Sequence, residues 1–147
     1  DLLAQADTDL LVLVPHTDVA AATLEISAQT LVRGRIEARH VTGGRPVHPV
    51  VVLLGCDTAG SADDPAGFAT RFLARDAAVV VSSLTMLRAS HAARLAQRLV
   101  AALREAAADR RREPLGDLVT AWRRAAVAEG LPAALALTAY GDADWTI

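Results

Sequence analysis

The sequence Val50-Val51-Val52-Leu53-Leu54-Gly55-Cys56-Asp57-Thr58-Ala59-Gly60 joins an uninterrupted apolar run to a turn of small and polar residues. Branched apolar residues without polar alternation are typical of a strand that is covered on both faces, as in parallel sheets. Cys56, the only cysteine of the chain, follows where this run ends. Open α/β sheets keep their reactive groups at the carboxyl ends of their strands. The stretch therefore predicts a buried strand that presents a thiol at its tip.

Two further apolar runs predict buried strands. Residues 10–15 form one of them, which ends at Pro15 because proline cannot continue a central ladder; His16 follows at once, and Thr17 opens the next loop. Residues 77–83 form the other. Between the Cys56 strand and residues 77–83, helical spacing of apolar residues predicts a helix that starts near residues 63–65 and ends near residue 75. A strand-helix-strand order implies a right-handed parallel crossover, so we expect a mostly parallel sheet.

The rest of the chain predicts flanking helices and short strands. Amphipathic spacing predicts helices over residues 90–107, capped by Ser90, and over residues 115–129, ended by Gly130. Alternation with period two in residues 23–26 and 31–38 predicts short strands or a hairpin beside the main sheet, and residues 134–140 read as a last strand. With 147 residues and 52% hydrophobic content, we expect one α/β domain over residues 1–147.

Composition and motifs exclude several classes of function. The net charge of -2 and the short basic run at residues 110–112, flanked by acids, give no footprint for nucleic acid. The chain has no lysine, no G-x-G-x-x-G or P-loop motif for a nucleotide, and no G-x-S-x-G motif for serine hydrolysis. We find neither a signal peptide nor an apolar stretch of bilayer length. The expectation is a soluble cytoplasmic protein without nucleic-acid or membrane partners.

The two strand ends suggest a Cys–His dyad. A cysteine is a useful nucleophile only as the thiolate, and a neighbouring histidine can take its proton and later protonate the leaving amine. If their strands are neighbours, Cys56 and His16 emerge at the same edge of the sheet. Taken alone, a cysteine after an apolar strand is more often a packing residue, and a histidine there is usually a turn residue. His40, His48 and His91 also occur in loops or helix ends, so position alone leaves the dyad open.

Six segments together resemble the CHAT domain, a bacterial relative of the caspase and separase cysteine peptidases. The similarity covers about residues 10 to 145. The segments that carry it are LLVLVPH (10–16), VVLLGCDT (51–58), GFATRFL (67–73), AAVVVSS (77–83), LGDL (115–118) and AYGD (139–142).

This resemblance implies a three-layer caspase-like fold and a cysteine endopeptidase that acts on a protein or peptide substrate without a metal or other cofactor. It implies catalytic roles for His16 and Cys56, with the amides of Thr17 and Cys56 holding the oxyanion. It also implies a substrate pocket near Asp57 and Ser82, in which Asp57 either favours a basic side chain or bonds its own turn.

Two features depart from the family pattern. The family usually has glycine directly after the histidine, whereas this chain has Thr17, whose branched side chain restricts the backbone. The alternative function is therefore a catalytically inactive domain for protein interaction or switching. Nine residues precede Leu10, which suggests a fold that lacks its amino-terminal strands. On this interpretation the chain is the carboxyl-terminal portion of a longer protein with a regulatory partner or further domains.

Overall fold

The central sheet contains four strands in the computed structural model, which describes residues 9–56, 58–59, 67–109 and 112–146. Its strands lie in the order β1 (Leu10–Leu13), β5 (Val50–Leu53), β6 (Val79–Ser83) and β7 (Leu137–Gly141). β1, β5 and β6 run parallel, whereas β7 runs antiparallel to β6. The prediction of an α/β domain with a mostly parallel sheet is thus confirmed.

The position of β5 inside the sheet, between β1 and β6, explains why its sequence shows no polar alternation. All four of its residues are buried. Val50 and Val52 belong to the hydrophobic cluster on one face of the sheet, while Val51 and Leu53 belong to the cluster on the other face. Because successive side chains of a strand point to opposite faces, a strand covered on both sides must be apolar throughout.

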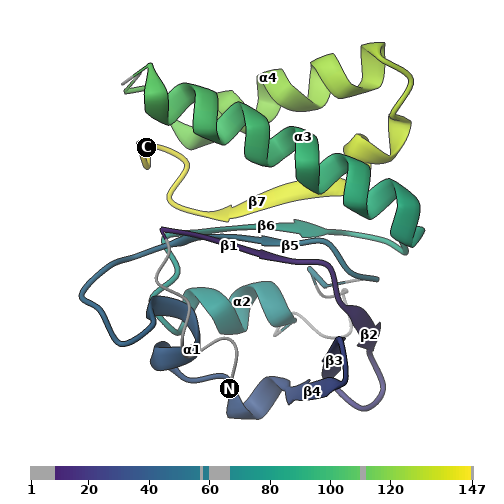
Figure 1. Ribbon diagram of the computed structural model, residues 1–147, viewed down its shortest axis with the longest axis vertical. Helices are drawn as coiled ribbons and strands as arrows, with labels where there is room; N and C mark the ends of the chain where they lie inside the picture. The colour runs from purple at the N-terminus through teal and green to yellow at the C-terminus, as the bar shows by residue number, and fades with distance from the viewer. Residues whose placement is uncertain (1–8, 57, 60–66, 110–111, 147) are drawn as a thin grey trace.

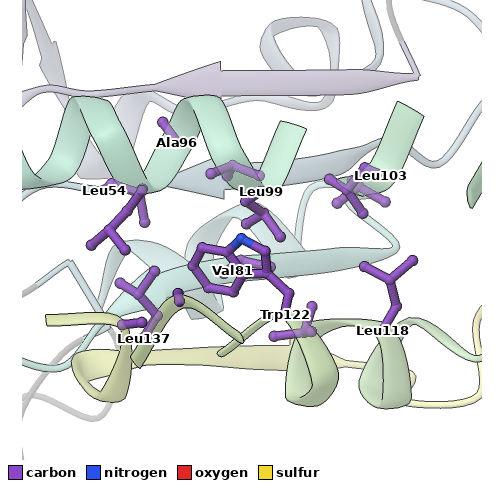
Figure 2. Packing of buried hydrophobic residues seen from close by; sticks show 14 of the residues in the cluster. Leu54, Val81, Ala96, Leu99, Leu103, Leu118, Trp122 and Leu137 are labelled. Atoms are coloured by element: carbon purple, nitrogen blue, oxygen red, sulfur yellow. The ribbon is translucent and has the colours of Figure 1, made fainter. Parts of the chain in front are cut away.

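One face of the sheet is covered by the two long helices, α3 (Ala89–Ala108) and α4 (Leu115–Ala128) (Figure 1). Leu99 of α3 and Trp122 of α4 point into the cluster between these helices and the sheet (Figure 2). α4 ends before Gly130, which adopts a left-handed φ of 81°, as expected. The prediction that Ser90 caps α3 is wrong, since the helix begins one residue earlier and its N-cap is Arg88.

The other face is covered by two short helices, α1 (Ala38–Thr42) and α2 (Phe68–Leu73) (Figure 1). Phe72 is fully buried there. The predicted start of α2 near residues 63–65 lies outside the described residues. α1 was not predicted, because a helix of five residues is too short to show amphipathic spacing.

A separate antiparallel sheet lies beside the carboxyl end of β1 (Figure 1). It contains β2 (His16–Asp18), β3 (Thr23–Ile26) and β4 (Gln29–Val32), in that order. The predicted hairpin is confirmed, but the strand expected over residues 31–38 is wrong beyond Val32, where the 3₁₀ helix η1 (Arg33–Arg35) begins. The loop expected after His16 is also wrong, because these residues pair with β3.

The last strand begins later than its sequence suggests. The 3₁₀ helix η2 (Pro132–Ala136) occupies the first part of the expected strand, and Pro132 at its start provides a φ suited to a helical turn. β7 then pairs with β6 along its whole length, from Leu137 opposite Ser83 to Gly141 opposite Val79.

Over the described residues, no helix combines the length and apolarity that crossing a membrane requires.

The packing of α3 on the sheet predicts a large cost for Leu99→Ala. Leu99 is fully buried, so its truncation should leave a cavity and lower the free energy of unfolding by about 2–5 kcal/mol. Leu135→Ala is the matched control; its side chain is 60% exposed, and we expect a change within about 0.5 kcal/mol. Urea denaturation followed by circular dichroism measures both, and equal effects would contradict the described core.

Candidate active site at the carboxyl ends of β1 and β5

β1 and β5 are direct neighbours, as the proposed dyad requires. Leu13 pairs with Leu53 at the end of the two strands, and the amide of Leu54 donates to the carbonyl oxygen of Leu13 at 2.9 Å. Because the two strands are parallel, the segments that follow them leave the sheet at the same edge. The segments that carry His16 and Cys56 therefore begin side by side.

The close approach of Gly55 to Thr17 joins these two segments. A Cβ atom placed on Gly55 would lie 2.5 Å from Thr17 Oγ1, 2.9 Å from Thr58 Cγ2 and 3.0 Å from Pro15 Cγ. Real Cβ atoms essentially never approach another heavy atom this closely, so only glycine fits without a shift of its neighbours. Thr17 itself is buried. The residue before Cys56 thus packs directly against the residue after His16.

Hydroxyl groups anchor the Cys56 turn to β6. The hydroxyl of Thr58 donates to the carbonyl oxygen of Leu53 at 2.9 Å and lies 2.8 Å from Ser82 Oγ and 3.1 Å from Ser83 Oγ. The hydroxyl of Ser83 in turn donates to the carbonyl oxygen of Gly55. All three hydroxyl residues are fully buried. The backbone on both sides of Cys56 is therefore held by side chains in the interior.

Sequence reasoning missed the supporting role of this hydroxyl cluster, defined by Thr58, Ser82 and Ser83. The available signal was a pair of serines that ends an otherwise apolar strand, since buried polar side chains need partners. Ser82 was expected near the substrate. Its hydroxyl is instead enclosed and bonded to Thr58, which makes it an internal support in this structure.

The side chains of Cys56 and His16 are not hydrogen-bonded to each other in the described part of the chain. Cys56 is a free, partly buried cysteine, and its Sγ lies 3.9 Å from the carbonyl oxygen of Leu87, to which the thiol is a weak donor. His16 is exposed at the start of β2, and its ring has no hydrogen-bond partner among the described residues. The structure brings together the two strand ends and leaves both side chains accessible.

Of the two remaining predicted site residues, Thr17 and Asp57, the structure describes only Thr17. Thr17 points its side chain inward, and its buried Oγ1 has no hydrogen-bond partner in the described part of the chain. Its side chain therefore acts as a packing contact against Gly55. Asp57 lies outside the described residues.

Neither metal ligands nor known relatives assign a chemistry to this site. Among the residues that the structure describes, no group of three or more His, Cys, Asp or Glu side chains could hold a metal ion. Comparison of the chain with known proteins found no matching family model, no matching curated protein and no matching solved structure. The proposal for its function therefore rests on the residues, their placement and the resemblance found in the sequence.

The contact between Gly55 and Thr17 predicts that Gly55→Ala is destabilising. The added methyl group would force Thr17, Thr58 or Pro15 to move, which should lower the free energy of unfolding by about 1–3 kcal/mol. Gly34→Ala is the control, because a Cβ there meets no atom within 4 Å, and it should change stability by less than about 0.5 kcal/mol. A Gly55→Ala protein as stable as the Gly34→Ala protein in urea would show that the two segments do not touch.

The hydroxyl cluster predicts a cost for Thr58→Val, which keeps the shape of the side chain and removes its hydroxyl. Buried hydroxyls of β6 would lose a partner, so we expect a loss of about 1–3 kcal/mol. Thr30→Val on the exposed face of β4 is the matched control and should change stability by less than about 0.5 kcal/mol. Thermal and urea unfolding of both variants measure the difference.

Proposed function

We propose that this chain is a cysteine endopeptidase of the caspase-like type, in which Cys56 is the nucleophile and His16 handles the proton. The observation that carries the proposal is the close approach of Gly55 to Thr17, which keeps the segment after β5 beside the segment after β1. The resemblance to the CHAT domain supports it, as do helices on both faces of a mostly parallel sheet. The proposed substrate is a protein or peptide.

The chemistry would proceed in two steps. His16 accepts the proton of the Cys56 thiol, the thiolate attacks a peptide carbonyl, and the ring then protonates the amine that leaves. Water, deprotonated by the same ring, hydrolyses the acyl-enzyme and regenerates the thiol. Amide N–H groups at Cys56 and Thr17 would stabilise the oxyanion. Rotation of the exposed His16 side chain and of Cys56 must first bring the ring to the sulfur, since catalytic hydrogen bonds are often loose in unliganded enzymes.

A domain for protein interaction without catalysis is the second candidate. Thr17 favours it, because its side chain fills the space against Gly55 where the family usually has glycine. The contact of the Cys56 sulfur with the Leu87 carbonyl, rather than with an imidazole, also favours it. In this case Cys56 is an ordinary thiol and its reactivity does not depend on His16.

Alkylation of Cys56 by iodoacetamide separates the two candidates. An ordinary cysteine is about 1% ionised at pH 6.5, so a thiol without a proton acceptor reacts slowly there. If His16 takes the proton, the wild-type protein should react rapidly, and His16→Ala should slow the reaction at least about tenfold. Mass spectrometry of the alkylated protein measures the rate, since Cys56 is the only cysteine of the chain.

His48→Ala is the control variant, because His48 is also exposed but bonds to the carbonyl oxygen of Asp76, away from Cys56. It should react as fast as the wild type. Slow alkylation of the wild-type protein, with no further loss in His16→Ala, would overturn the peptidase proposal and favour the interaction domain.

A further inference from the structure

Glu25 lies directly across the small sheet from His16. In the antiparallel pairing of β2 with β3, His16 is opposite Glu25 and Thr17 is opposite Leu24. Thr17 and Leu24 are buried, whereas His16 and Glu25 are both exposed. Residues directly opposite in an antiparallel pair project from the same face, with Cβ atoms about 4.5–5.5 Å apart. The carboxylate therefore sits on the same accessible face as the imidazole and within side-chain reach of it.

Both side chains are available for this contact. Neither His16 nor Glu25 makes a side-chain hydrogen bond or ion pair in the described part of the chain, so no competing partner has to be displaced. The two are not bonded to each other in this structure either, and rotation of the side chains would join them. The other carboxylate among the strands of this sheet, Asp18, already accepts a hydrogen bond from the amide of Ala21 at 2.9 Å.

We infer that Glu25 is a positioning residue for His16, an inference that rests on the proposed function. One ring nitrogen of His16 takes the proton from the Cys56 thiol, and the other donates its N–H to the carboxylate of Glu25. The carboxylate keeps its own charge and opposes the positive charge that the ring acquires. A hydrogen bond to one nitrogen also determines which tautomer is present and which nitrogen faces the thiol.

The register makes this role specific to one residue. A carboxylate that orients a histidine must approach from the side away from the nucleophile. β2 is the edge strand of the small sheet, with β3 on one side only. Glu25 therefore reaches the ring from β3, the only strand paired with β2 among the described residues.

The test is the rate of Cys56 alkylation in Glu25→Gln, with and without His16→Ala, in a double-mutant cycle. Glu25→Gln removes the attraction between opposite charges on directly opposed strand residues. We expect this loss to slow Cys56 alkylation about 1.4-fold to fivefold. The loss should vanish when His16 is already alanine. Asp18→Asn is the matched control, since it also replaces one carboxylate on this face by an amide, and it should leave the rate unchanged.

Nitrogen-15 NMR of the His16 ring gives a second readout that does not depend on Cys56. Glu25→Gln should change the ring nitrogen shifts, and Asp18→Asn should not. Equal effects of the two substitutions on rate and shifts, or a rate loss that persists without His16, would overturn the inference. If His16→Ala leaves alkylation unchanged, the peptidase proposal and the positioning role of Glu25 in it both fail, and the ring shifts then decide whether Glu25 holds the ring at all.

Discussion

The burial of β5 on both faces is the constraint on which the rest of the structure depends. A strand that lies between β1 and β6 and under helices on each side has no exposed position, so every side chain from Val50 to Leu53 must be apolar. The chain can turn polar only where it leaves the sheet. That boundary is Gly55–Cys56, and this is why the thiol stands at the edge of the core, partly buried, rather than inside it.

Two independent sets of contacts hold the chain at Gly55–Cys56, where it leaves the sheet. Buried hydroxyls of Thr58 and Ser83 hold the backbone around Cys56 to β6 from within. Steric contact of Gly55 with Thr17 holds the β2 segment from the other side. Since the hydroxyl bonds are directional and enclosed, and the glycine contact leaves no space, the two strand ends have little freedom to separate.

The sequence predicted the main sheet well because its signals are local and strong. Three apolar runs with no alternation mark buried strands, and the helix expected between the last two implies the parallel crossover from β5 to β6 that the structure contains. It failed at β2 and α1, which are too short for periodicity and depend on contacts with β3 and the core. For the site, the sequence placed His16 and Cys56 at strand ends, but the pairing of β1 with β5, the support from Thr58 and the pairing with Glu25 depend on long-range contacts and register.

Thr17 both contacts Gly55 and keeps His16 on the exposed face of β2, and a glycine at this position would lack the first contact. Its branched side chain fills the space against Gly55 and so places β2 relative to β5, while its place in the strand keeps His16 on the opposite, exposed side. A glycine there would free the backbone for oxyanion binding but would remove the contact that positions the histidine strand. The threonine therefore has less backbone freedom than a glycine but fixes the position of β2 relative to β5. Under the proposed peptidase function, Thr17 is compatible with catalysis, because precision would then depend on the rotation of the His16 side chain, which Glu25 would restrict.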